Sequence, residues 1–112
     1  MHVAEDWVRD VAVLALKGRL DSATVPGVEA KLDATVADPD LRGLVIDFAG
    51  LDYVSSLGLR TLLKTAKQCR EKGVRLAVCA LHPHVREVFD ISGFSSIFPI
   101  HPDRLAAVAS VR

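Results

Sequence analysis

The chain has 112 residues, enough for one hydrophobic core and too few for two ordinary domains. Half of the residues are hydrophobic and a quarter are charged, a composition that excludes intrinsic disorder. The 14 Lys and Arg residues balance the 14 Asp and Glu residues, so the net charge does not favour a nucleic-acid partner. The N-terminus has no basic start followed by an apolar run, and no apolar segment is long enough for a membrane helix. The composition therefore predicts a single soluble, cytoplasmic domain over residues 1–112.

The first predicted elements are two strands and a helix. Strands are expected over residues 2–9 and 11–17, joined by a tight turn. Both faces of the second strand are apolar, which indicates a strand inside a sheet that is covered on both sides. Thr24 is expected to cap a helix with Pro26 in its first turn, and Pro39 marks where this helix has ended.

Three further strands, each followed by a helix, complete the pattern. They are expected in this order: a strand over residues 44–48, a helix ending near Gly73, a strand over 74–79, a helix over 82–91, a short strand over 95–100 and a closing helix over 102–111. Strands that are linked by single helices must be parallel, with right-handed crossovers. The sequence therefore predicts an α/β fold, with a mostly parallel sheet of about five strands, an antiparallel edge strand and about four helices.

Several large or buried-type side chains are assigned to the core. Phe89, Ile91 and Phe94 follow helical and post-helical spacing that directs them toward the sheet. Cys69, in a helical pattern, and Cys79, at the end of an apolar strand, lack the spacing of a metal knuckle or a redox pair. We expect both cysteines to be reduced packing residues.

The chain lacks the motifs of common catalytic sites. Gly58 stands alone after the third strand, so neither a dinucleotide fingerprint nor a Walker pattern can be drawn. The serines at 55–56 do not lie in a G-x-S-x-G elbow. His82 and His84 flank a proline at a predicted helix start, and no carboxylate or cysteine joins them at metal-ligand spacing. We therefore predict no catalytic residue, no metal and no cofactor.

The stretch DFAGLDYVSSLGLRTLL, residues 47–63, places two serines where a buried strand passes into a helix. Positive potential gathers at a helix N-terminus, so a phosphoryl group on Ser56 would be stabilised there. On local sequence alone, the simpler interpretation is that the Ser56 hydroxyl caps a helix that begins at Leu57, which contributes about 1 kcal/mol.

Three segments together resemble the STAS domain, the family of anti-sigma factor antagonists and of the cytoplasmic tails of sulfate transporters. They are GRLDSAT at 18–24, the strand-turn-helix at 47–63 and VREVFDISGF at 85–94, in the family's order and at its separations. The resemblance covers essentially the whole chain. It implies a stand-alone antagonist whose partner is both an anti-sigma factor and a serine kinase of the GHKL ATPase type. Phosphorylation by this kinase would switch the antagonist off, and a serine phosphatase would reset the cycle.

The resemblance also implies the site. The family's usual Asp-Ser pair falls on Ser55 and Ser56, which makes Ser56 the phosphoacceptor. The family's loop beside the phosphosite matches Asp21 and Ser22, although turn chemistry ahead of Thr24 explains these two residues equally well.

We expect the partner-binding surface where this loop meets the start of the following helix. Loops at the carboxyl ends of adjacent parallel strands converge, and helix residues four apart share a face. The expected surface consists of Asp21, Ser22, Ser55, Ser56, Leu57, Gly58, Arg60 and Lys64. A function of a different class stays open: a STAS protein that is not phosphorylated and serves as a scaffold or sensory subunit of a transporter or signalling complex.

Overall fold

A five-stranded sheet runs through the computed structural model, which describes all of residues 1–112. Its strands lie in chain order: β1 (His2–Val8), β2 (Val11–Leu20), β3 (Gly43–Val54), β4 (Arg75–Cys79) and β5 (Ile100–His101). β1 pairs antiparallel with β2, and every other neighbouring pair is parallel. The predicted α/β fold with an antiparallel edge strand is confirmed.

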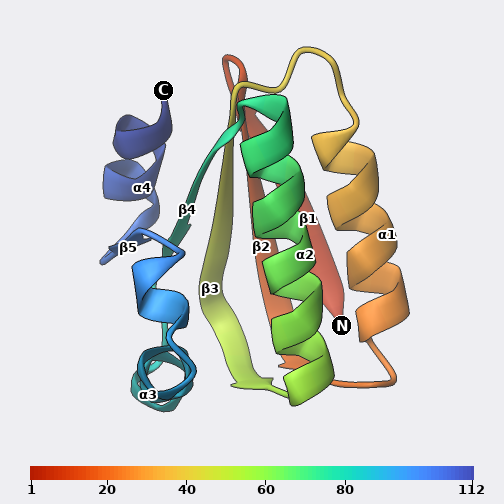
Figure 1. Cartoon of the computed structure of the whole chain (residues 1–112), viewed down its shortest axis with the longest axis vertical. Coiled ribbons are helices and arrows are strands. Elements are labelled where there is room, and N and C mark those ends of the chain that lie inside the picture. The colour runs from red at the N-terminus through yellow and green to blue at the C-terminus, as the bar shows by residue number, and fades with distance from the viewer.

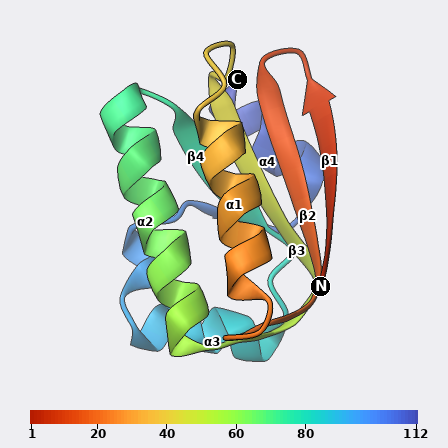
Figure 2. The same cartoon turned by 90° about the vertical axis from the view of Figure 1, so that its right-hand side faces the viewer.

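Four helices surround the sheet. They are α1 (Val25–Val36), α2 (Ser56–Lys72), α3 (Pro83–Ile91) and α4 (Arg104–Val111), and a short 3-10 helix, η1 (Phe94–Ser96), follows α3. Figure 2 shows α1 and α2 side by side in front of the sheet and α4 behind it. In Figure 1, α3 lies at the lower end of the molecule, near the end of β3 and the start of α2.

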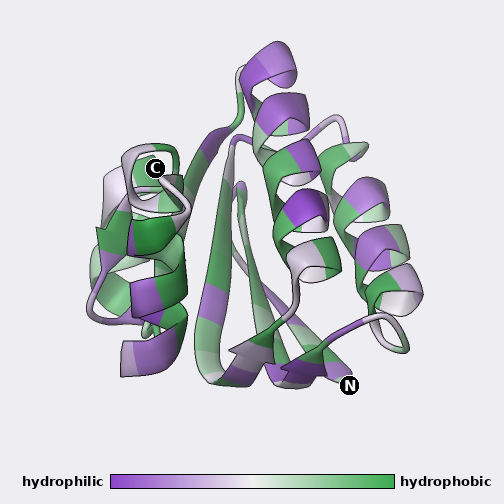
Figure 3. Ribbon diagram, turned by 60° about the horizontal axis from the view of Figure 1, so that its bottom comes forward, coloured by the Kyte–Doolittle hydropathy of each residue, from purple (hydrophilic) through white to green (hydrophobic).

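The two faces of the sheet pack into two cores of unequal size. Ala12, Leu14 and Leu16 of β2 belong to the larger core, beneath α1 and α2, whereas Val11 and Val13 belong to a smaller core beneath α4. Figure 3 shows mostly hydrophobic strands between helices that carry hydrophilic bands. The alternation explains why both faces of β2 are apolar in sequence, as expected for a strand covered on both sides.

An aromatic cluster forms part of the larger core. The ring centroid of Phe89 is 5.7 Å from that of Phe48, 5.7 Å from that of Phe94 and 5.6 Å from that of Phe98. The core assignments of Phe89 and Phe94 are confirmed, since both are buried. That of Ile91 is wrong, because its side chain is 79% exposed. Two residues in a helix turn by about 200°, so Ile91 faces away from the side on which Phe89 is buried.

Three predicted strand boundaries are also wrong, the first being that of β2, which ends at Leu20 and not at residue 17. The segment 95–100 was expected to be a strand, but η1 occupies its start and only Ile100–His101 pair with β4. Gly93 adopts a φ of 79° and turns the chain from α3 directly into η1. β3 continues past Phe48 to Val54, because its second half pairs with the end of β2 after two shifts in register.

Candidate functional site

The loops after β2 and β3 meet at one end of the sheet. Leu20 and Val54 are register partners, and the amide of Ser55 donates a hydrogen bond of 2.9 Å to the carbonyl oxygen of Leu20. Gly58 allows α2 to begin close to this point, since a Cβ at this position would lie 2.9 Å from Cγ and 3.2 Å from the backbone oxygen of Leu20. The geometry thus brings the loop that begins at Asp21 beside the first turn of α2.

Ser55, rather than Ser56, caps α2. Its backbone is extended and its hydroxyl accepts a hydrogen bond of 3.1 Å from the amide of Gly58. The helix therefore begins at Ser56, and the interpretation in which Ser56 caps a helix beginning at Leu57 is wrong. A serine cap of this kind satisfies one of the amides that a helix N-terminus leaves without a partner.

This arrangement leaves the Ser56 side chain free. Ser56 is exposed, and its hydroxyl has no hydrogen-bond partner within the protein. The first turn of α2 contains no acidic residue, so the positive end of the helix dipole is not neutralised from within the helix. Leu57, the next residue, is 38% exposed and gives the same surface an apolar element. A negative group on Ser56 would lie at the positive end of α2 without breaking a hydrogen bond of the side chain.

Asp21 stabilises the loop between β2 and α1 through hydrogen bonds to its backbone. Its Oδ1 accepts hydrogen bonds from the amides of Ala23, at 3.1 Å, and Thr24, at 3.3 Å. Thr24 is the residue before α1, as expected, but its hydroxyl donates to the carbonyl oxygen of Arg19 at 2.7 Å and does not cap the helix. Turn chemistry thus accounts for the position of Asp21, while the exposed Ser22 makes no such contact.

Tyr53 and Arg19 belong to the same end of the molecule, and the sequence analysis missed both. The guanidinium carbon of Arg19 lies 4.0 Å from the ring centroid of Tyr53, and its Nε is 3.9 Å from Oδ2 of Asp21. Tyr53 is 38% exposed. Tyr53 was missed because β3 was expected to end at Phe48, so its register with Arg19 was not visible.

Arg60 and Lys64 differ in their surroundings. Arg60 is exposed and has no ion pair. Lys64 bridges α2 to α1, with its Nζ 3.1 Å from Oε2 of Glu29 and 3.3 Å from Oδ2 of Asp33. The hydrogen bond to Glu29 raises the pKa of Lys64 above its usual value. Lys64 also lies about 12 Å from Ser56 along the helix axis. Arg60 is therefore the cation that lies nearer to Ser56, and unlike Lys64 it has no ion pair.

The start of α3 is tied to the bend of β3. The ring of His82 is hydrogen-bonded to the carbonyl oxygen of Ala49 at 2.7 Å, and the ring of His84 to that of Asp52. His82 is the residue before α3, in line with the expectation that these histidines mark a helix entry. No group of three His, Cys, Asp or Glu side chains is arranged to hold a metal ion.

Both cysteines are free and buried, as the sequence predicted. Burial raises the pKa of the Cys69 thiol to about 11 and that of Cys79 to about 12. Thiols with such pKa values stay protonated near neutral pH and are poor nucleophiles.

None of the helices has the length and apolar character needed to cross a bilayer.

The chain is similar to several known proteins. The model of the STAS domain matches residues 6–107. BtrV of Bordetella bronchiseptica, provisionally named an anti-sigma factor antagonist, is 45% identical over 112 residues, which cover 100% of this chain and 96% of BtrV. The anti-sigma F factor antagonist of Paenibacillus polymyxa is 29% identical over 111 residues, or 99% of this chain and 95% of that protein. The crystal structure of an anti-sigma factor antagonist from Mycobacterium paratuberculosis superposes with a TM-score of 0.91 at 28% identity, covering 99% of this chain and 93% of that one.

Proposed function

The chain belongs to the STAS domain family, and we propose that it is an anti-sigma factor antagonist, a protein that acts by binding an anti-sigma factor. The names of its relatives support this proposal, and they match nearly the whole chain. The surface proposed for the contact is the end of the sheet where the Asp21 loop meets the first turn of α2. It combines an exposed Leu57, the free cation of Arg60 and the exposed ring of Tyr53. Aromatic and Arg side chains are the usual anchors of protein interfaces.

We propose further that the partner is a serine kinase of the GHKL ATPase type and that it phosphorylates Ser56. The observation that carries this proposal is the free hydroxyl of Ser56 on the first residue of α2. A kinase can reach it without breaking a hydrogen bond. The phosphoryl group, with a charge of about −1.5 to −2 at pH 7, would be stabilised by the helix dipole and by the unpaired amides of the first turn. A serine phosphatase would remove it.

The departure from the family's usual Asp-Ser pair is compatible with this role. Asp and Ser are comparable N-cap residues, because each offers a side-chain oxygen to an amide in the first turn. Ser55 performs this task here, with its hydroxyl on the amide of Gly58. The acceptor serine therefore keeps its place at the start of α2, although its neighbour is not a carboxylate.

Phosphorylation would switch binding off by changing the surface rather than the fold. A neutral hydroxyl becomes a bulky dianion, and an acidic or apolar partner residue docked there would meet repulsion or a desolvation cost of several kcal/mol. A micromolar complex has a binding free energy of about −8 kcal/mol, so a loss of this size dissociates it at working concentrations. The antagonist itself should stay folded.

Binding of the anti-sigma factor, measured by isothermal titration calorimetry, tests the proposed surface. Arg60→Ala should weaken binding without lowering the melting temperature much. Asp21→Asn removes the negative charge but keeps an oxygen that can accept the two loop amides, so it separates charge from loop structure. Lys17→Gln, an exposed cation elsewhere on β2, is the matched control. Unchanged affinity in both site variants would place the contact elsewhere.

A further inference from the structure

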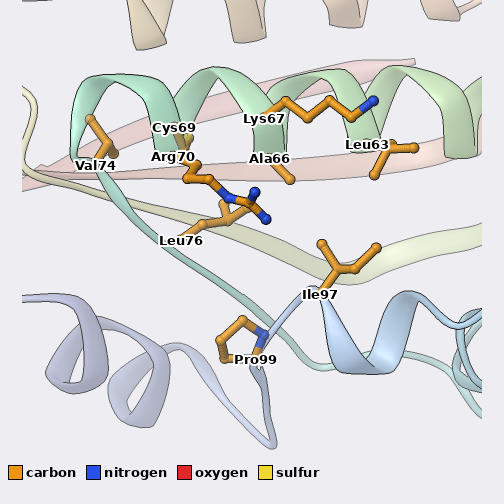
Figure 4. A pocket seen from close by; sticks show the side chains of 9 residues that line it. All are labelled: Leu63, Ala66, Lys67, Cys69, Arg70, Val74, Leu76, Ile97 and Pro99. Atoms are coloured by element: carbon orange, nitrogen blue, oxygen red, sulfur yellow. The ribbon is translucent and has the colours of Figure 1, made fainter.

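A groove outside the proposed partner surface has no part in the function proposed above. It lies between the second half of α2 and the segment that leads from η1 to β5, and it has a volume of about 440 Å³. Figure 4 shows Leu63 and Ala66 on the α2 side, Ile97 and Pro99 on the opposite side, and Leu76 of β4 between them. Volumes of this size are typical of small-molecule sites.

The groove is open because β5 is short. Only Val78 and Cys79 of β4 pair with β5. The amide of Val78 bonds to the carbonyl oxygen of Pro99, but Pro99 has no N–H with which to continue the ladder toward Leu76. The chain before Pro99 therefore leaves the sheet edge, and Ile97 remains 44% exposed over the groove. Apolar surface is thus left in contact with water, and a ligand that covers it gains free energy.

Two cations line the groove, and neither is paired with an acidic side chain. Lys67 and Arg70 are exposed on α2, and neither takes part in an ion pair. In Figure 4 the side chain of Arg70 reaches from α2 toward Leu76 and Ile97. No acidic residue lines the groove. Arg70 lies in the last turn of α2, where the helix dipole favours a cation. The dipole does not explain Lys67 in the same way, because Lys67 lies before that turn.

From this combination we propose that the groove binds a straight-chain alkyl carboxylate of medium length. The alkyl chain lies over Leu63, Ala66 and Leu76 and is covered by Ile97. The carboxylate meets Arg70, whose guanidinium can bind it through two parallel hydrogen bonds, and Lys67 supplies a second positive charge. The proposal rests on the groove alone and is independent of the function proposed for Ser56.

Dodecanoate below its micelle-forming concentration is the probe for this site. Calorimetric titration should give saturable binding of one molecule per chain, and amide NMR shifts should concentrate in the second half of α2, at Leu76 and around Ile97. Decanoate should bind more weakly, by about fourfold for each methylene that no longer enters the groove. Dodecyltrimethylammonium, which has the same chain and the opposite charge, should not bind.

Two variants test the contacts. Ala66→Glu places a carboxylate four residues before Arg70, where an ion pair supports the helix, so the fold should hold while the cation is neutralised and dodecanoate binding is lost. Arg70→Gln should weaken binding by roughly fivefold, the effect of one partly exposed charged contact. Lys17→Gln, outside the groove, should bind dodecanoate like the unmodified protein, and circular dichroism should show all variants folded. Absence of saturable binding, equal binding of the cationic amphiphile, or unchanged binding by folded Ala66→Glu would each overturn the proposal.

Discussion

Replacing Ser55 by alanine should destabilise the protein, whereas replacing Ser56 should not. Ser55→Ala removes the hydroxyl that accepts the 3.1 Å hydrogen bond from the amide of Gly58. Gly58 is buried against Leu20, so water cannot easily replace the lost acceptor. Loss of an N-cap serine costs about 1 kcal/mol, and a buried amide without a partner brings the expected decrease in unfolding free energy to about 1–2 kcal/mol.

Urea unfolding followed by circular dichroism measures this difference. Ser55→Ala should lower the midpoint with an unchanged m-value, and should lower the melting temperature by about 4 °C or more for each kcal/mol lost. Ser56→Ala should unfold like the unmodified protein, because the Ser56 hydroxyl has no partner, and Ser55→Asp should retain the cap. Equal stability of Ser55→Ala and the unmodified protein, or an equal loss in Ser56→Ala, would refute the assignment of the cap to Ser55. Since Ser56 remains, Ser55→Ala should still be phosphorylated.

Three other predictions concern the core. Phe89→Ala should cost roughly 3–5 kcal/mol in chemical denaturation, because Phe89 is fully buried among three other phenylalanines. Gly58→Ala should destabilise the fold by about 1–2 kcal/mol and weaken anti-sigma factor binding, because its Cβ would force α2 away from Leu20. Cys69 and Cys79 should resist a thiol reagent at pH 8 until the protein unfolds. Their pKa values are raised in the fold, so their contribution to stability should be present below about pH 8.5 and be lost as the pH rises toward 11 to 12.

Matched variants control for each of these results. Ile91→Ala removes a similar apolar side chain that is 79% exposed, so it should be nearly neutral. Gly27→Ala lies in α1 with nothing within 4 Å of the added Cβ, so it should stabilise the protein by up to about 1 kcal/mol. A large loss of unfolding free energy in Ile91→Ala, or a destabilisation by Gly27→Ala, would show that side-chain burial and the space around an added Cβ do not determine the stability of this protein. A native thiol reaction at pH 8 would contradict the burial of the cysteines.

Much of the fold could be predicted from the sequence because its signals are local. The apolar alternation of β2, the helical spacing of Leu62 and Phe89 and the stop at Gly73 each follow from periodicity and turn chemistry. One failure depends on contacts between distant segments, because β3 extends to Val54 only where its second half pairs with β2. The failure at 95–100 is local, because η1 follows the turn at Gly93 and Pro99 has no N–H with which to continue the pairing of β5 with β4.

The same distinction applies to the site. That the Asp21 loop would lie beside Ser55 followed from the rule that carboxyl ends of adjacent parallel strands converge. The local sequence does not decide which serine caps the helix, because serine is a good cap at either position and the choice depends on where α2 begins. The ring of Tyr53 beneath Arg19, and the pairing of Lys64 with α1, are tertiary contacts that no local pattern contains.

Phosphorylation at Ser56 is the most direct test of the switch. The cognate kinase and ATP should add one phosphoryl group to the unmodified protein, detected by intact mass, and none to Ser56→Ala. Calorimetry should then show that the phosphorylated protein has lost its affinity for the anti-sigma factor while its melting temperature is nearly unchanged. Ser56→Ala should bind constitutively, and Ser56→Glu should bind weakly. The switch is contradicted if Ser56→Ala is phosphorylated to the same extent as the wild-type protein, or if the phosphorylated wild-type protein binds as tightly as the unphosphorylated one. A non-phosphorylated scaffold or sensory role then takes its place.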